Sequence, residues 1–343
     1  MKFFNLFIQE LAVDLGTANT LIIQDGQVVV DEPSIVAVDK KTGEVIAVGN
    51  RAMQMHEKTH KNIETIRPLK DGVIADFQAA EAMIQGLISM IGNKRRFFTH
   101  LRMVICIPSG ITEVEKRAVF DSADHVDSKE TYLIHEPMAA ALGIGLDVEE
   151  PVGNMVIDIG GGTTEIAVIA LSGIVCDQSI RVAGDEFTND IIDYMRREHN
   201  MLVGERTAEQ MKIHIGSALK KLDNPPDPYA INGRDLMTGI PRQIVVRYEE
   251  TAEALDKSIM KIEEAVLKAL ELTPPELSAD IYRTGLYLTG GGALLKGLDK
   301  RLSAKTKLPV IVADDPLRAV VRGTGLALKN TDRFSFLMDR KSI

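Results

Sequence analysis

The segment VDLGTANT, residues 13–20, returns without gaps 144 residues later as IDIGGGTT, residues 157–164. An apolar run follows each copy, which is the pattern of a strand, a tight Asp-x-Gly turn and a second strand. Because the unit occurs twice, we expect two similar domains, each offering one aspartate and one turn to a shared cleft. A nucleotide would fit between two such turns.

Outside the repeat, short apolar runs alternate with longer helical periods, which predicts an α/β fold. Turn-rich segments at residues 33–68 and 224–241 interrupt this alternation and indicate inserted subdomains. The predicted strands are Leu11–Val13, Leu21–Ile23, Val28–Val30, Met103–Ile107, Met155–Ile159, Ile166–Ala170 and Leu286–Leu288. The predicted helices are Phe77–Ile91, Glu113–Ala123, Met138–Ile144, Glu186–His199, Ala208–Leu222, Glu250–Leu272 and Leu294–Ala304.

Length and composition restrict the class of protein. A chain of 343 residues is long enough for two domains with separate cores. Its net charge of -9 repels nucleic-acid phosphates, so we do not expect a nucleic acid as partner. Two cysteines are too few for a disulfide framework, and no apolar run is long enough to span a membrane. The sequence indicates a globular protein whose N-terminal segment is retained.

The glycines of the second copy predict a phosphate site. Gly160, Gly161 and Gly162 remove side chains from the turn, so that backbone N–H groups can approach an anion, and Thr163 and Thr164 add hydroxyl donors. The alternative is a plain tight hairpin, which the copy at Asp14 disfavours. Two aspartates beside one polyphosphate would repel it without a cation. Asp14 and Asp158 therefore predict Mg²⁺ that is held largely through water.

Glu136 directly precedes a helix that starts with Pro137. The partial positive charge of the helix end would keep this carboxylate ionised and oriented, which suits a water-positioning or base role. The alternative is a simple charge at a helix start.

Two further segments could contact a nucleoside. The third glycine turn, Gly290–Gly292, could pass beneath a base or ribose, although a plain helix-start turn fits equally well. Glu209 and Lys212 share one helical face and could reach a ribose, or they could form a solvated ion pair.

In their order and spacing, these segments resemble the actin-like ATPases, and within them the MreB family of bacterial rod-shape filament proteins. The resemblance covers about residues 11–330, and segments typical of MreB are RPLKDGVIADF (67–77), NGRDLM (232–237) and ADDP (313–316). It implies an actin-like fold of two duplicated domains, each with a mixed sheet and flanking helices, around a central nucleotide cleft. The implied subdomains are IA (1–32, 68–149 and 316–343), IB (33–67), IIA (150–181 and 247–315) and IIB (182–246).

The resemblance also implies roles for individual residues. Glu136 would orient the attacking water, and Asp14 and Asp158 would complete the catalytic set with Mg²⁺. The first turn contains no lysine, so charge stabilisation would rest on Mg²⁺, backbone amides and hydroxyls. The implied contacts to ATP or ADP come from Thr17, Ala18, Asn19, Gly160, Gly161, Gly162, Thr163, Glu209, Gln210, Met211, Lys212, Thr289, Gly290, Gly291, Gly292 and Ala293.

The function implied by the resemblance is that of a filament protein which determines cell shape by organising cell-wall synthesis. Slow ATP hydrolysis would regulate polymerisation into head-to-tail double protofilaments on the inner face of the cell membrane. Its partners would be other copies, inner-membrane lipid and the cell-wall elongation machinery. A small-molecule kinase of the same superfamily is the alternative, but the sequence has no motif for an acceptor pocket. A chaperone-type ATPase would need a peptide-binding domain, for which the chain leaves no room.

Aromatic residues predict membrane contact independently of the resemblance. On a helix, Phe3, Phe4, Phe7, Ile8 and Leu11 would share one face, as in an interfacial amphipathic helix. The pair Phe97 and Phe98 follows three cations, Lys94, Arg95 and Arg96, which anionic headgroups would attract. The alternative is that both segments are packed core.

Overall fold

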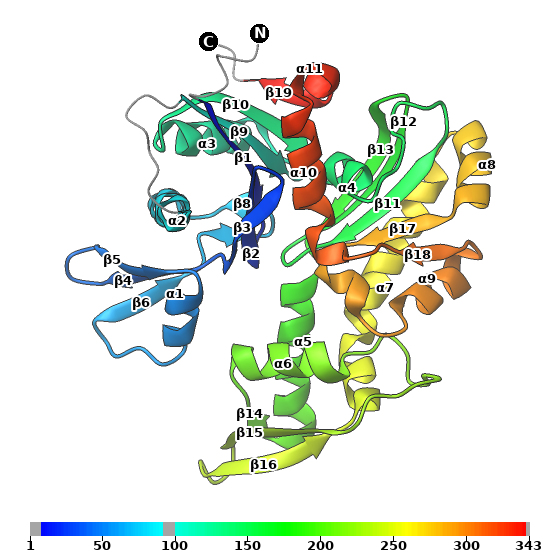
Figure 1. Ribbon diagram of the computed structural model, residues 1–343. Coiled ribbons are helices and arrows are strands. Elements are labelled where there is room, and N and C mark those ends of the chain that lie inside the picture. Colours follow the sequence, from blue (N-terminus) through cyan, green and yellow to red (C-terminus); the bar gives the residue numbers. More distant parts are fainter. Residues whose placement is uncertain (1–7, 92–99, 341–343) are drawn as a thin grey trace. The chain divides into compact units, whose positions relative to one another are not determined.

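The computed structural model describes residues 8–91 and 100–340, and the chain divides into two compact units (Figure 1). Unit 1 comprises Met1–Pro151, Ile169–Ile174 and Arg318–Ile343, and unit 2 comprises Val152–Val168 and Val175–Leu317. The predicted membrane residues Phe3, Phe4, Phe7, Phe97 and Phe98 lie outside the described residues.

Unit 1 is built on a mixed six-stranded sheet with the order β19-β10-β9-β1-β2-β3. Strands β1 and β9 run parallel, β2 and β3 follow antiparallel, and the apolar side chains of β1 and β9 are buried in one core with those of α2. The elements of this layer are β1 (Ile8–Leu15), β2 (Asn19–Gln24), β3 (Gln27–Pro33), β7 (Leu69–Lys70), β8 (Val73–Ile74), α2 (Phe77–Met90), β9 (His100–Ile107), α3 (Glu113–Asp124), β10 (Ser128–His135), α4 (Glu136–Gly143), α10 (Ala319–Lys329), α11 (Thr331–Phe334) and β19 (Met338–Arg340).

The first turn-rich segment folds as a small layer of its own within unit 1. Its three-stranded sheet has the order β5-β4-β6, and it stands at the lower left of Figure 1. Its core is small and includes Ile35 and Ala52. Its elements are β4 (Val36–Asp39), β5 (Val45–Val48), α1 (Asn50–Met55) and β6 (Ile63–Ile66).

The position of α4 is fixed by a close crossing with α10. A Cβ atom on Gly143 would lie 1.8 Å from the carbonyl oxygen of Ala319, and one on Gly323 would lie 1.7 Å from that of Ala139. Only glycine fits at either position, because backbone meets backbone there. This crossing holds the helix that begins with Glu136.

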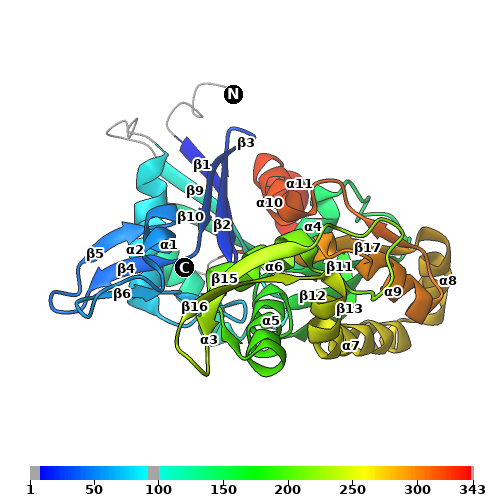
Figure 2. The ribbon, with the colours of Figure 1, turned by 90° about the horizontal axis from the view of Figure 1, so that it is seen from below.

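Unit 2 contains a five-stranded sheet with the order β13-β12-β11-β17-β18 and a smaller sheet with the order β14-β15-β16. Helix α7 packs against α5, as Figure 2 shows, and its apolar face shares one core with the sheet. The elements are β11 (Asn154–Ile159), β12 (Thr164–Ala170), β13 (Gly173–Ile180), α5 (Gly184–His199), β14 (Met201–Leu202), α6 (Glu205–Ile215), β15 (Tyr229–Asp235), β16 (Pro241–Val246), α7 (Tyr248–Leu272), α8 (Pro275–Thr284), β17 (Leu286–Thr289), the 3₁₀ helix η2 (Gly291–Leu294), α9 (Leu298–Thr306) and β18 (Val310–Val312).

Three predicted helices are wrong in part. The helix predicted to continue to Leu222 ends at Ile215, because Gly216 leaves the helical conformation. The helix predicted from Leu294 is η2 followed by α9, and Gly297, with a φ of 78°, starts the second. The amphipathic helix predicted through Leu11 is a strand from Ile8 onward, and Leu11 is fully buried in the core.

Candidate functional site

In unit 1, the first turn joins β1 to β2 and is braced from two sides. The Ser34 hydroxyl donates to the carbonyl oxygen of Gly16 at 2.6 Å, and its backbone N–H donates to that of Ala18 at 2.9 Å. The N–H of Gly72, in the tight hairpin between β7 and β8, donates to the Thr17 hydroxyl oxygen at 3.0 Å. The turn therefore has a fixed shape, and the Thr17 hydroxyl can still donate to a phosphate oxygen.

Asp14 stands at the end of β1 beside a cysteine that the sequence analysis did not identify. The thiol of Cys106, on the neighbouring strand β9, donates to Asp14 Oδ1 at 3.1 Å. Burial raises the pKa of Asp14 to about 6, and the thiol hydrogen bond partly opposes this. Burial and the charges of Asp14 and Glu136 raise the pKa of Cys106 well above its usual value. The cysteine is therefore a neutral thiol at pH 7.

Glu136 is the first residue of α4, not the residue before it, and His135 is the N-cap. Pro137 follows inside the first turn, which suits its fixed φ. The carboxylate therefore lies at the positive end of the helix, as predicted, and close enough to Cys106 to influence its pKa.

In unit 2, the second turn joins β11 to β12. Asp158 is only 5% exposed, and the Thr289 hydroxyl donates to its Oδ1 at 2.8 Å. The first two N–H groups of α5 hold the turn, because Gly184 donates to Gly160 O at 3.1 Å and Asp185 to Gly161 O at 2.8 Å. Two carbonyl groups of the turn, those of Gly160 and Gly161, are thus paired within the fold.

The third glycine turn packs directly against the second. A Cβ on Gly290, whose φ is 79°, would lie 2.3 Å from Ile159 O and 2.8 Å from Asp158 Oδ1. A Cβ on Gly292 would lie 2.2 Å from the Ile159 side chain. These two glycines are therefore required by packing, whatever they contact in a ligand. The structure places both glycine turns side by side within unit 2.

The pair Glu209 and Lys212 is not a solvated ion pair. Lys212 Nζ lies 2.7 Å from Glu209, and it also donates to Gly184 O at 2.8 Å and to the Thr188 hydroxyl at 3.1 Å. The Thr188 hydroxyl in turn donates to Glu209 at 2.7 Å. The two side chains join α6 to the start of α5, next to the second turn.

Gln210 and Met211, which lie between this pair in the sequence, differ in exposure. The Met211 side chain is only 1% exposed and belongs to the core of unit 2, so it offers a ligand no side-chain contact. Gln210 is exposed, and its carbonyl oxygen lies 2.7 Å from His214 Nδ1.

The residues present fit Mg²⁺ held mainly through water. Each unit offers one buried or partly buried aspartate at a predicted phosphate turn, and carboxylate oxygen is a donor that this ion prefers. Among residues 8–91 and 100–340, no three His, Cys, Asp or Glu side chains form a group that could enclose a metal. Such a site would need ligands from phosphate and water.

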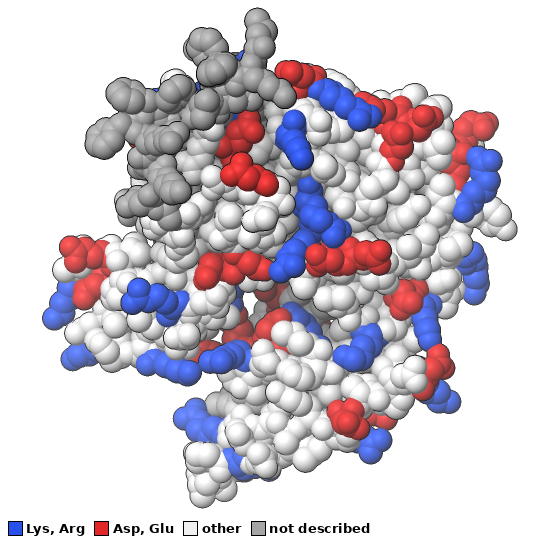
Figure 3. Space-filling model, viewed as in Figure 1, with Lys and Arg blue, Asp and Glu red and all other residues white. Residues whose placement is uncertain are grey.

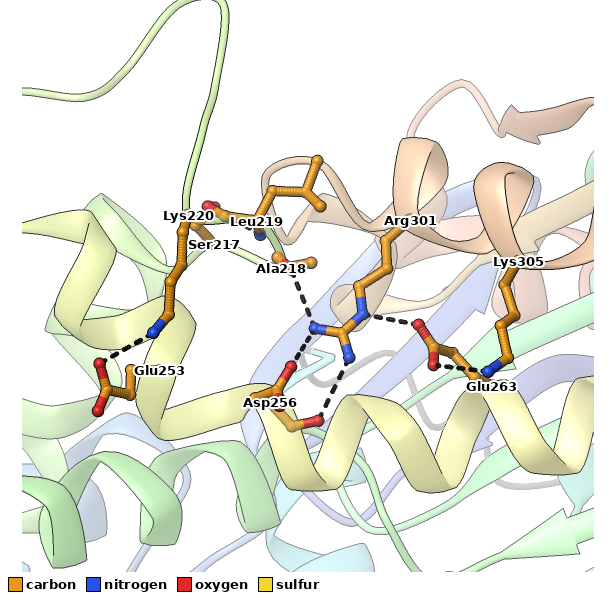
Figure 4. A network of polar contacts seen from close by, with 9 residues as sticks. All are labelled: Ser217, Ala218, Leu219, Lys220, Glu253, Asp256, Glu263, Arg301 and Lys305. Atoms are coloured by element: carbon orange, nitrogen blue, oxygen red, sulfur yellow. Dashed lines mark hydrogen bonds and ion pairs between the residues drawn. The ribbon is translucent and has the colours of Figure 1, made fainter.

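A cavity of about 560 Å³ opens elsewhere in unit 2, between α7, α9 and the segment after α6. None of the predicted nucleotide residues lines it, and its charged side chains pair with one another (Figure 4). It is therefore separate from the candidate site.

Comparison with known proteins identifies the family. A family model described as MreB/Mbl protein matches residues 8–335. The chain belongs to the MreB/Mbl family. The cell shape-determining protein Mbl of Bacillus subtilis is 47% identical over 329 residues, which cover 96% of this chain and 98% of that protein. The cell shape-determining protein MreB of Escherichia coli K12 is 47% identical over 339 residues and covers 96% of each chain.

Solved structures confirm the predicted actin-like fold for this MreB/Mbl chain. MreB5 of Spiroplasma citri, bound to AMPPNP, superposes with a TM-score of 0.90 at 39% identity and covers 95% of this chain and 97% of its own. A subunit of the MamK double helical filament gives a TM-score of 0.78 at 20% identity, covering 94% of this chain and 98% of its own. The second likeness concerns the fold alone.

Proposed function

We propose that this MreB/Mbl chain is an ATP-binding filament protein that determines cell shape by organising cell-wall synthesis. The observation that carries the proposal is the repeated half-site, in which each unit has a braced turn and an aspartate at the end of a strand. Support comes from relatives named cell shape-determining proteins and from MreB5 of Spiroplasma citri, which was solved with AMPPNP and with ADP.

In the proposed activity, the two turns bind the phosphates of ATP. Backbone N–H groups of Gly161 and Gly162 and the hydroxyls of Thr17 and Thr163 supply donors, which suits a site without a lysine in the first turn. Mg²⁺, when bound, would neutralise phosphate charge. Glu136, oriented at the start of α4, would hold the attacking water and accept its proton. Hydrolysis would be slow and would time filament turnover.

Sedimentation with nucleotide tests this proposal against the alternative of a small-molecule kinase. A filament protein pellets with Mg·ATP above a critical concentration, and its pelleting with Mg·ADP differs. A kinase would remain in the supernatant at every concentration. ATP binding measured by calorimetry, combined with a complete absence of pelleting, would contradict the filament part of the proposal while leaving nucleotide binding intact.

We place a candidate filament contact on the hairpin of β15 and β16. Leu236, Met237 and Ile240 are 41%, 83% and 63% exposed, and the end of this hairpin is mostly uncharged at the bottom of Figure 3. A head-to-tail contact is heterologous, so an apolar end that fits a different surface of the next copy can repeat without limit. Met237→Glu should raise the critical concentration, whereas Thr238→Ser should not. Unchanged pelleting of Met237→Glu would remove this hairpin from the contact.

We also propose that the filament lies on the inner membrane face and meets the cell-wall elongation machinery there. Phe3, Phe4, Phe7, Phe97 and Phe98 would enter the lipid, whereas Ile8 pairs with His100 in the main sheet of unit 1. No helix in residues 8–91 and 100–340 is long and apolar enough to cross a membrane. Each site would bind weakly, and repetition along the filament would give avidity.

Liposome co-sedimentation tests the membrane contact. The wild type should pellet with anionic vesicles, and removal of residues 1–7 together with Phe97→Ala and Phe98→Ala should abolish this. If that variant still forms filaments and still binds the vesicles, the membrane assignment is wrong.

A further inference from the structure

Within unit 2, the segments assigned to the nucleotide are joined to one another by a closed series of contacts. The second turn bonds to the start of α5 through Gly184, and α5 bonds to α6 through Lys212. On the other side, Gly290 and Gly292 pack against Ile159, which directly precedes the second turn. One link remains, which joins the far end of α6 to the segment after the third glycine turn.

Lys296 makes that last link. Its Nζ donates to the carbonyl oxygen of His214 at 2.9 Å and lies 3.4 Å from that of Ile213, both in the last turn of α6. Its own carbonyl oxygen accepts from the N–H of Ala218 at 2.8 Å and from the Ser217 hydroxyl at 3.3 Å. Lys296 therefore contacts the end of α6 through its side chain and the following residues through its backbone.

The end of α6 depends on these bonds because a helix leaves its last carbonyl groups without helical partners. The N–H of Gly216 donates to Lys212 O at 2.9 Å, and the Thr251 hydroxyl of α7 donates to Ile215 O at 2.7 Å. The two carbonyl groups between them are those that face Lys296. A cation at this end also suits the negative pole of the helix. Burial lowers the pKa of Lys296, so its ammonium group is partly withdrawn from water.

Ala218, which follows Ser217, is also held by a side chain of α9. Arg301 Nη1 donates to Ala218 O at 3.1 Å, while its Nε donates to Glu263 at 2.7 Å and Nη1 lies 2.8 Å from Asp256 (Figure 4). Ala218 is thus held on both sides, because its N–H donates to the carbonyl oxygen of Lys296 and its carbonyl oxygen accepts from Arg301. The connection after α6 cannot shift without breaking one of these bonds.

We propose that Lys296 is a positioning residue for the nucleoside part of the ligand: it sets the distance between α6 and the third glycine turn. Glu209 and Lys212 lie on α6, and Gly290, Gly291 and Gly292 form the third glycine turn. The phosphate turn at Gly160–Gly162 is held by α5 and does not touch Lys296. This inference rests on the proposed nucleotide site and adds a residue that contacts no ligand.

The test compares ATP with inorganic triphosphate, both with Mg²⁺, by calorimetric titration of the full chain. Lys296→Met removes the ammonium group and keeps the apolar stem. Because hydrogen bonds from a charged donor are lost, we expect ATP affinity to fall about tenfold and triphosphate affinity to change less than about twofold. Lys296→Arg should restore most of the ATP affinity. A general loosening of unit 2 would weaken both ligands alike and would not be rescued by arginine.

Lys300→Met is the matched control. Lys300 is an exposed lysine on α9 that pairs with Asp223 at 2.5 Å and does not contact α6, so the charge change is the same and ATP affinity should stay unchanged. If Lys296→Met does not fold, Thr251→Val removes the other side-chain donor to the same helix end and is measured in the same way.

The outcomes separate the two proposals. A wild type that binds neither ATP nor ADP overturns the proposed function and this inference with it. A wild type that binds ATP, with Lys296→Met equal to it for both ligands, overturns the inference alone. An equal loss of ATP and triphosphate affinity also overturns it, because it reveals a structural role only.

Discussion

The turn at Asp14 in unit 1 and the turn at Asp158 in unit 2 share one backbone plan, but different side chains serve their aspartates. In unit 1 the donor is the thiol of Cys106, and in unit 2 it is the hydroxyl of Thr289. A thiol is the weaker donor of the two. The two copies therefore share the strand and turn but differ in the side chain that donates a hydrogen bond to the aspartate.

The two donors occupy equivalent positions. Strand β1 pairs in parallel with β9, with Val13 opposite Ile105, and β11 pairs in parallel with β17, with Ile157 opposite Leu288. Val13 and Ile157 are equivalent in the repeat, so the residues after Ile105 and Leu288 are equivalent too. The repeat therefore extends beyond residues 13–20 and 157–164 to the partner strands β9 and β17, which share no sequence motif.

The largest expected effect concerns hydrolysis. Glu136→Ala should keep ATP bound and reduce single-turnover hydrolysis about a hundredfold or more, since only the carboxylate that we propose orients the water is removed. Nucleotide affinity and hydrolysis are measured on the same preparation. Hydrolysis at the wild-type rate would remove Glu136 from the mechanism.

Asp158→Ala should instead weaken binding itself. Loss of a carboxylate at the proposed metal site should lower Mg·ATP affinity by about 10- to 100-fold, and Asp14→Ala should act in the same direction. Titration of both variants beside Glu136→Ala tests whether the turns share one role. An equal loss of affinity in Glu136→Ala and Asp158→Ala would contradict the assignment.

Sequence patterns predicted the strands and turns at Asp14 and Asp158 because these depend on neighbouring residues. They did not predict that Cys106 contacts Asp14, because sheet register over 92 positions decides that contact. For the same reason Lys296 was missed, since its partners lie on α6. The helix predicted through Leu222 was too long, because apolar periodicity continues beyond Gly216 while the backbone does not. The sequence thus predicted local turns and caps, but not contacts between residues far apart in the chain.

The raised pKa of Asp14 predicts that the stability of the folded chain depends on pH. Between pH 4 and about 6 the folded chain holds a proton on Asp14 that the unfolded chain has released, so the free energy of unfolding falls as pH rises. Asp14→Asn removes this loss and should be more stable than the wild type by about 3 kcal/mol at pH 8, with little gain near pH 4. Urea unfolding at both pH values measures it.

The control for that prediction is Asp158→Asn. It makes the same change in unit 2, where a hydroxyl already donates to the carboxylate. We expect a smaller gain, because the stronger donor offsets more of the cost of burial. A gain for Asp14→Asn that is the same at pH 4 and pH 8 would show that titration of Asp14 is not its cause.

The smallest expected effect isolates the donor itself. Cys106 is 3% exposed, and Cys106→Ser replaces the thiol with a hydroxyl of nearly the same shape. Because a hydroxyl is the stronger donor to a carboxylate, the pKa of Asp14 should fall by about half a unit, whereas Cys106→Ala should raise it. The carboxyl carbon resonance of Asp14, followed by NMR against pH, measures this directly. Thr289→Ser keeps a hydroxyl in unit 2 and should leave the Asp14 titration unchanged. If serine and alanine at position 106 shift the midpoint equally, the thiol does not set the acidity of Asp14, and burial alone accounts for its raised pKa.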